Sequence, residues 1–413
     1  MNSDLAYIAF LLIIWVLVHA LLKRKGKTNL WGRLEVGPYY LMLRSSFLNN
    51  FLRGGVEKHR KYVDLFFSLG TLASIFAMLY GFYFLSEGVY KFIAYRGTQP
   101  GTVALIIPGV TVKGTLLMKM LPAIVLVLIS HELFHKLAMH TYKIDVKSVG
   151  LALILFIPAA FVEPDEESFK KSRSMARVKV LAAGSLANII LAALFYAPVA
   201  YPNLHEAGIS LGYGPPSGVI ISGVIPKSPL ANATDIKGGD IIVGINGKPI
   251  HTIQDLVEVR LKPDEEVTIT YLKRENILKG GEAQPEVVTL VTMEDPYNKE
   301  RGIIGIIYPA PLKDIWPMAT YYPPKYPWLS LDTPAILFEI VLWCFAISLG
   351  VAAINMLPIY PLDGYGLTEA LLEKVGVKGR GRKITLYTLM TISLILLALN
   401  IIASYLPQLI FKP

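Results

Sequence analysis

Residues 120–140 read MLPAIVLVLISHELFHKLAMH, and the rest of the chain is organised around this stretch. An apolar run long enough to enter a bilayer leads into His131-Glu132-Leu133-Phe134-His135, the pattern H-E-x-x-H. Residues four apart on a helix share one face, so both imidazoles can reach one metal ion, with Glu132 beside them for proton transfer. A pair of buried structural histidines is the alternative interpretation. Ionisable side chains in a spanning helix are costly and usually functional, which favours the metal site.

The composition indicates a polytopic membrane protein, because 53% of the residues are hydrophobic and 17% are charged. The net charge of +9 does not indicate a nucleic-acid partner, since the basic residues lie in loops beside apolar segments, where they orient a membrane protein. The single cysteine, Cys344, excludes a disulfide framework and a cysteine-based metal site. We expect it to be packed in a core.

Six apolar segments have the length of a membrane span. The segment at residues 23–61 holds ten Lys and Arg against two acidic residues, which predicts a cytoplasmic location. Successive spans cross the membrane in opposite directions, so the long stretch at residues 202–332 and both termini should lie outside. The chain is thus expected to be a multi-pass protein of the cell membrane. The predicted spans are about Leu5–Leu22, Leu65–Leu85, Leu116–Met139, Val180–Tyr201, Pro334–Leu357 and Ile384–Leu406.

Val146–Pro164 reads VKSVGLALILFIPAAFVEP, which is too short and too interrupted at Pro158 to cross a bilayer. Its β-branched and aromatic residues predict an apolar β-hairpin. A re-entrant position in the membrane requires that its backbone bonds internally or to a partner strand. The edge of such a hairpin could accept an extended peptide by strand addition. A hairpin that serves only packing is the alternative.

Between the fourth and fifth spans, short apolar runs alternate with turn dipeptides, as in SGVIISGVIPKSPLANATDIKGGDIIVGINGKPI. A helix over Thr252–Leu261 and strands over Val267–Leu272 and Val287–Thr292 are predicted to follow. This stretch resembles a PDZ domain, a class that binds peptides along a strand and a helix, often at a C-terminal carboxylate. The resemblance implies a peptide or protein C-terminus as a partner; a filter without such a ligand is equally compatible. The matching residues are Gly218-Val219-Ile220-Ile221, Ser228-Pro229-Leu230-Ala231, Gly239-Asp240-Ile241-Ile242 and Ile245-Asn246-Gly247.

Two later spans carry polar residues. Gly184-Ser185-Leu186-Ala187-Asn188 combines small residues, which allow close helix contact, with an amide that could join helices or face the site. The fifth span runs from Asn355 through two prolines to Leu362-Asp363-Gly364, so its helix should break there. Asp363 at this depth needs a partner, and a metal ion is a suitable one.

A catalytic zinc needs a third protein ligand besides the two histidines. The extended pattern of soluble proteases would place a histidine at position 141, which is Thr141. Asp363 is one remaining option. A downstream glutamate is the other, and Glu163, Glu166 and Glu167 are available for it.

Together, H-E-x-x-H, Gly-x-x-x-Asn and Asn-x-x-Pro with Leu-Asp-Gly in successive core spans resemble the site-2 protease family of intramembrane zinc metalloproteases. The resemblance implies one Zn²⁺ per chain, bound by His131, His135 and Asp363, with Glu132 as the catalytic acid–base. It also implies single-pass transmembrane proteins as substrates in regulated intramembrane proteolysis. Asn188 and Asn355 are assigned to substrate binding.

The expected fold is thus a polytopic α-helical membrane protein with about six transmembrane helices, a re-entrant β-hairpin and an inserted α+β PDZ-like domain. Its site should open toward the cytoplasm and the PDZ-like domain should be extracytoplasmic. Counted as a straight helix from Pro334, however, Asp363 falls beyond a hydrocarbon core of about 30 Å, whereas His131 lies within it. The expected regions are 1–113 (two spans), 114–201 (first half of the catalytic core), 210–309 (PDZ-like), 330–366 (second half of the core) and 367–413 (cytoplasmic loop and last span).

Three other functions share parts of this pattern. A non-enzymatic membrane adaptor would use the PDZ-like domain to gather partners, with the histidines in packing or on a structural metal. A metal transporter would use intramembrane His and Asp as an ion path, but it has no need of Glu132. A prenyl-peptide protease also uses H-E-x-x-H near membranes, but without the Leu-Asp-Gly segment or a PDZ domain.

Overall fold

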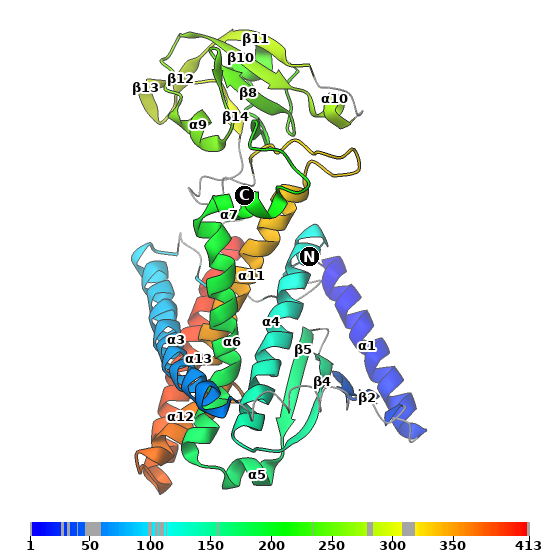
Figure 1. Cartoon of the computed structure of the whole chain (residues 1–413), viewed down its shortest axis with the longest axis vertical. Coiled ribbons are helices and arrows are strands. Elements are labelled where there is room, and N and C mark those ends of the chain that lie inside the picture. The colour runs from blue at the N-terminus through cyan, green and yellow to red at the C-terminus, as the bar shows by residue number, and fades with distance from the viewer. Residues whose placement is uncertain are drawn as a thin grey trace. The chain divides into compact units, whose positions relative to one another are not determined.

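The chain divides into two units in a computed structural model (Figure 1). One unit comprises Met1–Leu194 and Cys344–Pro413, and the other comprises Phe195–Trp343. Each is described by itself. The residues described are 2–25, 29–30, 34–38, 40–45, 59–97, 101–103, 106, 111–112, 114–154, 157–233, 235–278, 284–307 and 319–410.

Long apolar helices dominate the first unit. Among the described residues, 5 helices are long and apolar enough to cross a membrane, and much of their surface is exposed apolar side chain, as expected for helices that face lipid. They agree with the second to sixth predicted spans. A further helix, α1 (Asn2–Arg24), covers the first predicted span, whose membrane crossing remains a prediction. The five helices are α3 (Arg60–Ala94), α4 (Gly114–Thr141), α6 (Ser174–Ala200), α11 (Thr333–Asn355) and α13 (Gly379–Ile410).

The predicted hairpin is present as β4 (Val146–Ile154) and β5 (Ile157–Pro164), which pair antiparallel. It belongs to a larger sheet that the sequence analysis does not predict. β3 (Tyr40–Ser45) pairs along the other side of β4, and β2 (Leu34–Val36) and β1 (Asn29–Leu30) follow in the order β1-β2-β3-β4-β5. The backbone groups on that side of β4 therefore have a partner strand, and β5 is left as the edge strand of the hairpin.

An ion network joins three strands of this sheet. Glu163 on β5 accepts hydrogen bonds from Lys147 Nζ (2.5 Å) and Ser148 Oγ (2.7 Å) on β4, and from Arg44 Nη1 (3.1 Å) on β3. These hydrogen bonds, that of Lys147 above all, stabilise the carboxylate and lower the pKa of Glu163 to about 2. The carboxylate thus ties β3 to the hairpin.

Two short helices are also among the described elements of the first unit. α5 (Glu166–Lys171) follows the sheet and is capped by Asp165, whose side chain accepts from the Ser168 amide. α12 (Asp363–Lys374) follows a break after α11. Cys344, on α11, is buried, as the sequence predicts.

The second unit contains a small sheet in the order β11-β10-β8-β6, with β9 paired to β8. Its β10 strand alternates buried and partly buried residues, and Val267, Ile269 and Tyr271 point into the core. The predicted strands near residues 267 and 287 are β10 (Glu266–Leu272) and β11 (Glu286–Val291). The predicted helix is α9 (Ile253–Glu258), which begins at a Thr252 capping box and ends earlier than expected. The other elements are α7 (Pro202–Ile209), β6 (Val219–Ile220), β7 (Gly223–Val224), α8 (Pro229–Ala233), β8 (Ile241–Ile245), β9 (Lys248–Pro249), α10 (Arg274–Leu278), β12 (Met293–Asp295), β13 (Asn298–Ile303) and β14 (Ile306–Ile307).

Glu163→Gln should loosen the junction of β3 with the hairpin, because it removes the carboxylate that holds Lys147 and Arg44. We expect amide hydrogen exchange in β3 and β4 to become a few-fold faster at pH 7. Because the folded pKa of Glu163 lies below its ordinary value, its stabilising contribution is complete above about pH 4.5 and is lost as pH falls toward 2. The difference between the variant and the natural protein should shrink over that range.

Glu166→Gln is the matched control, because Glu166 forms an exposed pair with Lys170 one helical turn away. Exchange mass spectrometry should show unchanged protection in this variant. Equal effects of the two substitutions would contradict the role given to Glu163.

Candidate active site

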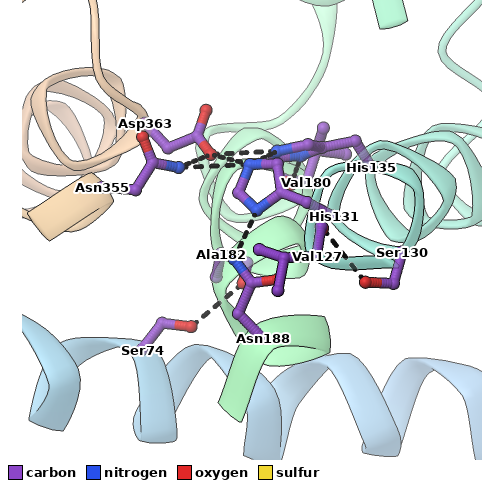
Figure 2. A network of polar contacts seen from close by, with 10 residues as sticks. All are labelled: Ser74, Val127, Ser130, His131, His135, Val180, Ala182, Asn188, Asn355 and Asp363. Atoms are coloured by element: carbon purple, nitrogen blue, oxygen red, sulfur yellow. Dashed lines mark hydrogen bonds and ion pairs between the residues drawn. The ribbon is translucent and has the colours of Figure 1, made fainter. Parts of the chain in front are cut away.

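His131 and His135 lie one turn apart on α4 and present their rings to the same point (Figure 2). Both side chains are buried, with 9% and 7% of the residue surface exposed. Their Nε2 atoms are 3.1 Å apart. Two imidazole nitrogens this close, away from water, require either a shared proton or a cation between them.

Asp363 reaches this point because the chain does not continue as a straight helix. α11 ends at Asn355, the next residues turn, and Asp363 is the first residue of α12. Its Oδ2 lies 2.9 Å from His135 Nε2 and 3.3 Å from His131 Nε2. The depth mismatch expected for a straight helix is thereby removed.

The three ligand atoms fit a metal ion. They lie within 4.8 Å of one another. Among the described residues, His131, His135 and Asp363 form the group of His, Cys, Asp and Glu side chains that could hold a metal ion. Ligand atoms at about 2.0–2.1 Å from a tetrahedral zinc are roughly 3.3 Å apart, close to the separations here. Two imidazoles and one carboxylate are also an ordinary donor set for catalytic zinc, and they leave a fourth position open.

Helix α6 fixes the ring of His135. The His135 Nδ1–H donates to the Val180 carbonyl oxygen at 2.8 Å, which leaves the Nε2 lone pair free for a metal. A backbone carbonyl cannot rotate away, so both the tautomer and the ring orientation are set by the fold.

His131 meets an equivalent partner in Asn188, which also comes from α6. The Asn188 amide lies 3.0 Å from His131 Nδ1, and its Oδ1 as placed is buried without a hydrogen-bond partner in the described part of the chain. If His131 Nε2 binds a metal, Nδ1 carries the proton and needs an acceptor. Turning the amide so that Oδ1 faces Nδ1 satisfies both groups, because the two ends of an amide exchange places with little change in shape.

Asn355 closes the site from the side of α11. Its Nδ2 donates to Asp363 Oδ2 at 2.7 Å and lies 3.2 Å from His131 Nε2 (Figure 2). The structure thus places both asparagines assigned to substrate binding against the ligand side chains. The sequence did not predict these contacts with the ligands, because the residues that meet come from different helices, α4, α6, α11 and α12.

Gly184 lets α6 come this close. A Cβ at this position would collide with the rings of both His131 and His135. The glycine of the Gly-x-x-x-Asn segment therefore serves the site directly, in addition to helix packing.

Glu132 is half-buried and lies outside the group of three ligand atoms. Its carboxylate interacts with the backbone amide of Val162 on β5. The residue expected to move protons is thus placed between the two histidines in sequence and against the edge strand of the sheet in space.

The alternative third ligands are used elsewhere. Glu163 is held in the ion network of the sheet. Glu166 and Glu167 form exposed pairs with Lys170 and Lys171 on α5.

Apolar helices of spanning length and a His–His–Asp group with both histidines buried define a membrane protein with a candidate metal centre. The sequence model described as Peptidase family M50 matches residues 119–399, more than half of the chain. The chain belongs to this family, the site-2 protease family, and is accordingly an integral membrane metalloprotease of a zinc-dependent family. An uncharacterized protein of Methanocaldococcus jannaschii is 26% identical over 382 residues, which span 90% of this chain and 87% of that protein.

Gly184→Ala should weaken the affinity for zinc by at least about tenfold. The new methyl group would displace both imidazoles from the point at which their Nε2 atoms meet. Zinc content of the purified chain, measured by elemental analysis, tests this.

Gly350→Ala on α11 is the matched control, since a Cβ there meets nothing within 4 Å. It should retain full zinc content. Normal zinc binding in the Gly184→Ala variant would contradict the close packing of α6 against the two histidine rings.

Proposed function

We propose that this protein is an intramembrane zinc endopeptidase that hydrolyses peptide bonds in the transmembrane segments of single-pass membrane proteins, as in regulated intramembrane proteolysis. One Zn²⁺ would be held by His131, His135 and Asp363. The observation that carries the proposal is the convergence of these side chains, from α4 and from the α11–α12 break, among helices of spanning length.

When bound by these residues, zinc would supply an activated water and would polarise the scissile carbonyl. Glu132 would accept a proton from the attacking water and deliver it to the leaving amine, a role that suits a carboxylate adjacent to the ligands but not ligating. The Val180 carbonyl and Asn188 hold the imidazoles in the required tautomers. Asn355 holds Oδ2 of Asp363 and has an N–H near the point where negative charge develops, so it is also suited to contact a substrate oxyanion.

The edge of β5 provides a surface for an unwound substrate. In an antiparallel pair, alternate residues direct their N–H and C=O groups to the free side. Because the Val162 amide meets Glu132, Val162 and Ala160 are the residues of β5 that face outward. Pro158 and Pro164, in the same register, have no N–H, and the Val162 amide meets Glu132, so strand addition would centre on the backbone of Ala160. This would place the added strand beside Glu132.

The same topology supports the remaining assignments. In this proposal the hairpin is re-entrant, the site opens toward the cytoplasm, and the second unit contains an extracytoplasmic PDZ-like domain at about residues 210–309. The small sheet with α9 beside it supports that domain, which would screen substrates by the length or C-terminus of their outer part. Localisation to the cell membrane belongs to the same proposal.

Membership of a protease family and the position of Glu132 favour this function over an adaptor or a metal transporter. Neither alternative needs a carboxylate beside both the ligand group and a strand edge.

Glu132→Gln should reduce cleavage of a reporter transmembrane segment by at least about 10³-fold, while zinc content stays at one ion per chain. Asp363→Ala should instead lose zinc, because a charged ligand is removed. Fragment analysis after co-expression and elemental analysis measure the two effects. Cleavage by the Glu132 variant would rule out this mechanism, and unchanged zinc in the Asp363 variant would move the third ligand elsewhere.

Ala160→Pro should slow cleavage of the same reporter about tenfold, because it removes the outward amide of Ala160 that can pair with an added strand. Zinc content should be unaffected, since the ligands are untouched.

Ala160→Val keeps the amide and serves as the control for a larger side chain at this position. It should cleave at close to the natural rate. If the proline variant also does so, the substrate is not held by this edge.

A further inference from the structure

Two segments of the second unit interlock next to the ends of two spanning helices. The first, residues 201–214, begins where α6 ends at Ala200, and Figure 1 shows α7 turning away from that end. The second, residues 319–333, leads into α11 at Thr333. We call these two segments together the collar. Both helix ends belong to the same unit as the collar.

Hydrogen bonds hold the two segments of the collar together. Tyr213 Oη donates to the Ser330 carbonyl oxygen at 2.7 Å. The amide of Gly214 donates to Pro323 at 2.8 Å, and that of Lys325 donates to Gly212 at 2.9 Å. The collar is therefore one structural element although its parts are separated by the small sheet.

The inward side of the collar is a packed core. Ile209, Tyr213 and Tyr322 are buried together. The buried His205 ring packs edge-on against Phe338 of α11, with 5.1 Å between ring centroids. The collar is thus fixed to the first turns of α11.

The outward side also carries large apolar side chains, which is unusual for a surface in water, between polar residues such as Asn203 and Lys325. Around α7, Tyr201, Leu204 and Leu211 are 67%, 52% and 86% exposed. On the second segment, Tyr326 and Trp328 are 45% and 77% exposed, and their rings stack at 4.8 Å. A helix facing water normally carries polar residues on its outer side. A cluster of exposed large apolar residues marks an interaction surface.

The bilayer surface fits this cluster better than a protein partner does. Trp and Tyr are enriched at the level of the lipid headgroups, where their rings are buried and their polar atoms stay wet. Short helices with one apolar face lie in the same layer. The collar adjoins the ends of α6 and α11, two helices of spanning length, so its exposed residues lie next to the points where such helices would leave a bilayer.

We propose that the collar is a membrane-interface anchor, whose outward residues bind the phospholipid headgroup and upper acyl region of the leaflet at which α6 ends. The anchor does not depend on the proposed protease function. It fixes the ends of α6 and α11 that belong to the second unit.

The experiment uses the full chain in nanodiscs that hold one copy each. Cys344→Ala removes the single cysteine, and a nitroxide is then attached after Leu211→Cys or, separately, Trp328→Cys. Collision rates are measured with oxygen, which concentrates in the bilayer, and with a water-soluble nickel chelate. The control is Tyr297→Cys, between β12 and β13 of the same unit, where the natural residue is 98% exposed.

Labels at Leu211 and Trp328 should show an oxygen-to-nickel ratio several-fold above that at Tyr297. A ratio equal to that of the control would place the collar in water and overturn the proposal. Protection from both reagents would also overturn it, because in a one-copy disc the surface would then be covered by the chain itself and not by lipid.

Discussion

Three polar groups brought to one point inside a largely apolar structure are the constraint on which this molecule depends. His131, His135 and Asp363 are costly to desolvate separately, so they are stable there only if they share a cation or protons and if their remaining polar atoms are paired. The neighbouring residues meet this requirement. Val180, Asn188 and Asn355 occupy the remaining hydrogen-bonding positions, and each comes from a helix that also packs the core. Site and helix packing therefore cannot be separated.

The break between α11 and α12 is the part of the fold that allows this convergence. It ends one helix at Asn355 and starts another at Asp363, so two residues eight apart in sequence meet at 2.7 Å. Gly364 makes the turn compact, because a Cβ there would collide with the carbonyls of Met356 and Leu357. The Leu-Asp-Gly segment thus combines a ligand with the residue that lets the chain bring it to the histidines.

The sheet shows a second solution to the same problem of unpaired polar groups. In the proposed re-entrant position, an apolar hairpin could not leave both edges open, since each free backbone group in lipid costs several kcal/mol. β3 covers the edge of β4, and an ion network at Glu163 fixes the junction. One edge, on β5, is left beside Glu132. Among the described residues, β5 is thus the strand of the hairpin with an unpaired edge, and it lies next to the candidate catalytic residue.

The sequence by itself determined which residues could do the chemistry and which segments are long and apolar enough to cross a membrane. Helical spacing in H-E-x-x-H, the proline-interrupted Leu-Asp-Gly segment and runs of apolar residues are local signals, and each is readable without knowing what it packs against. Tertiary structure decided the rest. The position of Asp363 at the histidines, the contacts of Asn188 and Asn355, the closeness that requires Gly184, and the pairing of β3 with β4 all join residues far apart in the chain. Such contacts follow from how helices and strands pack, and no local periodicity encodes them.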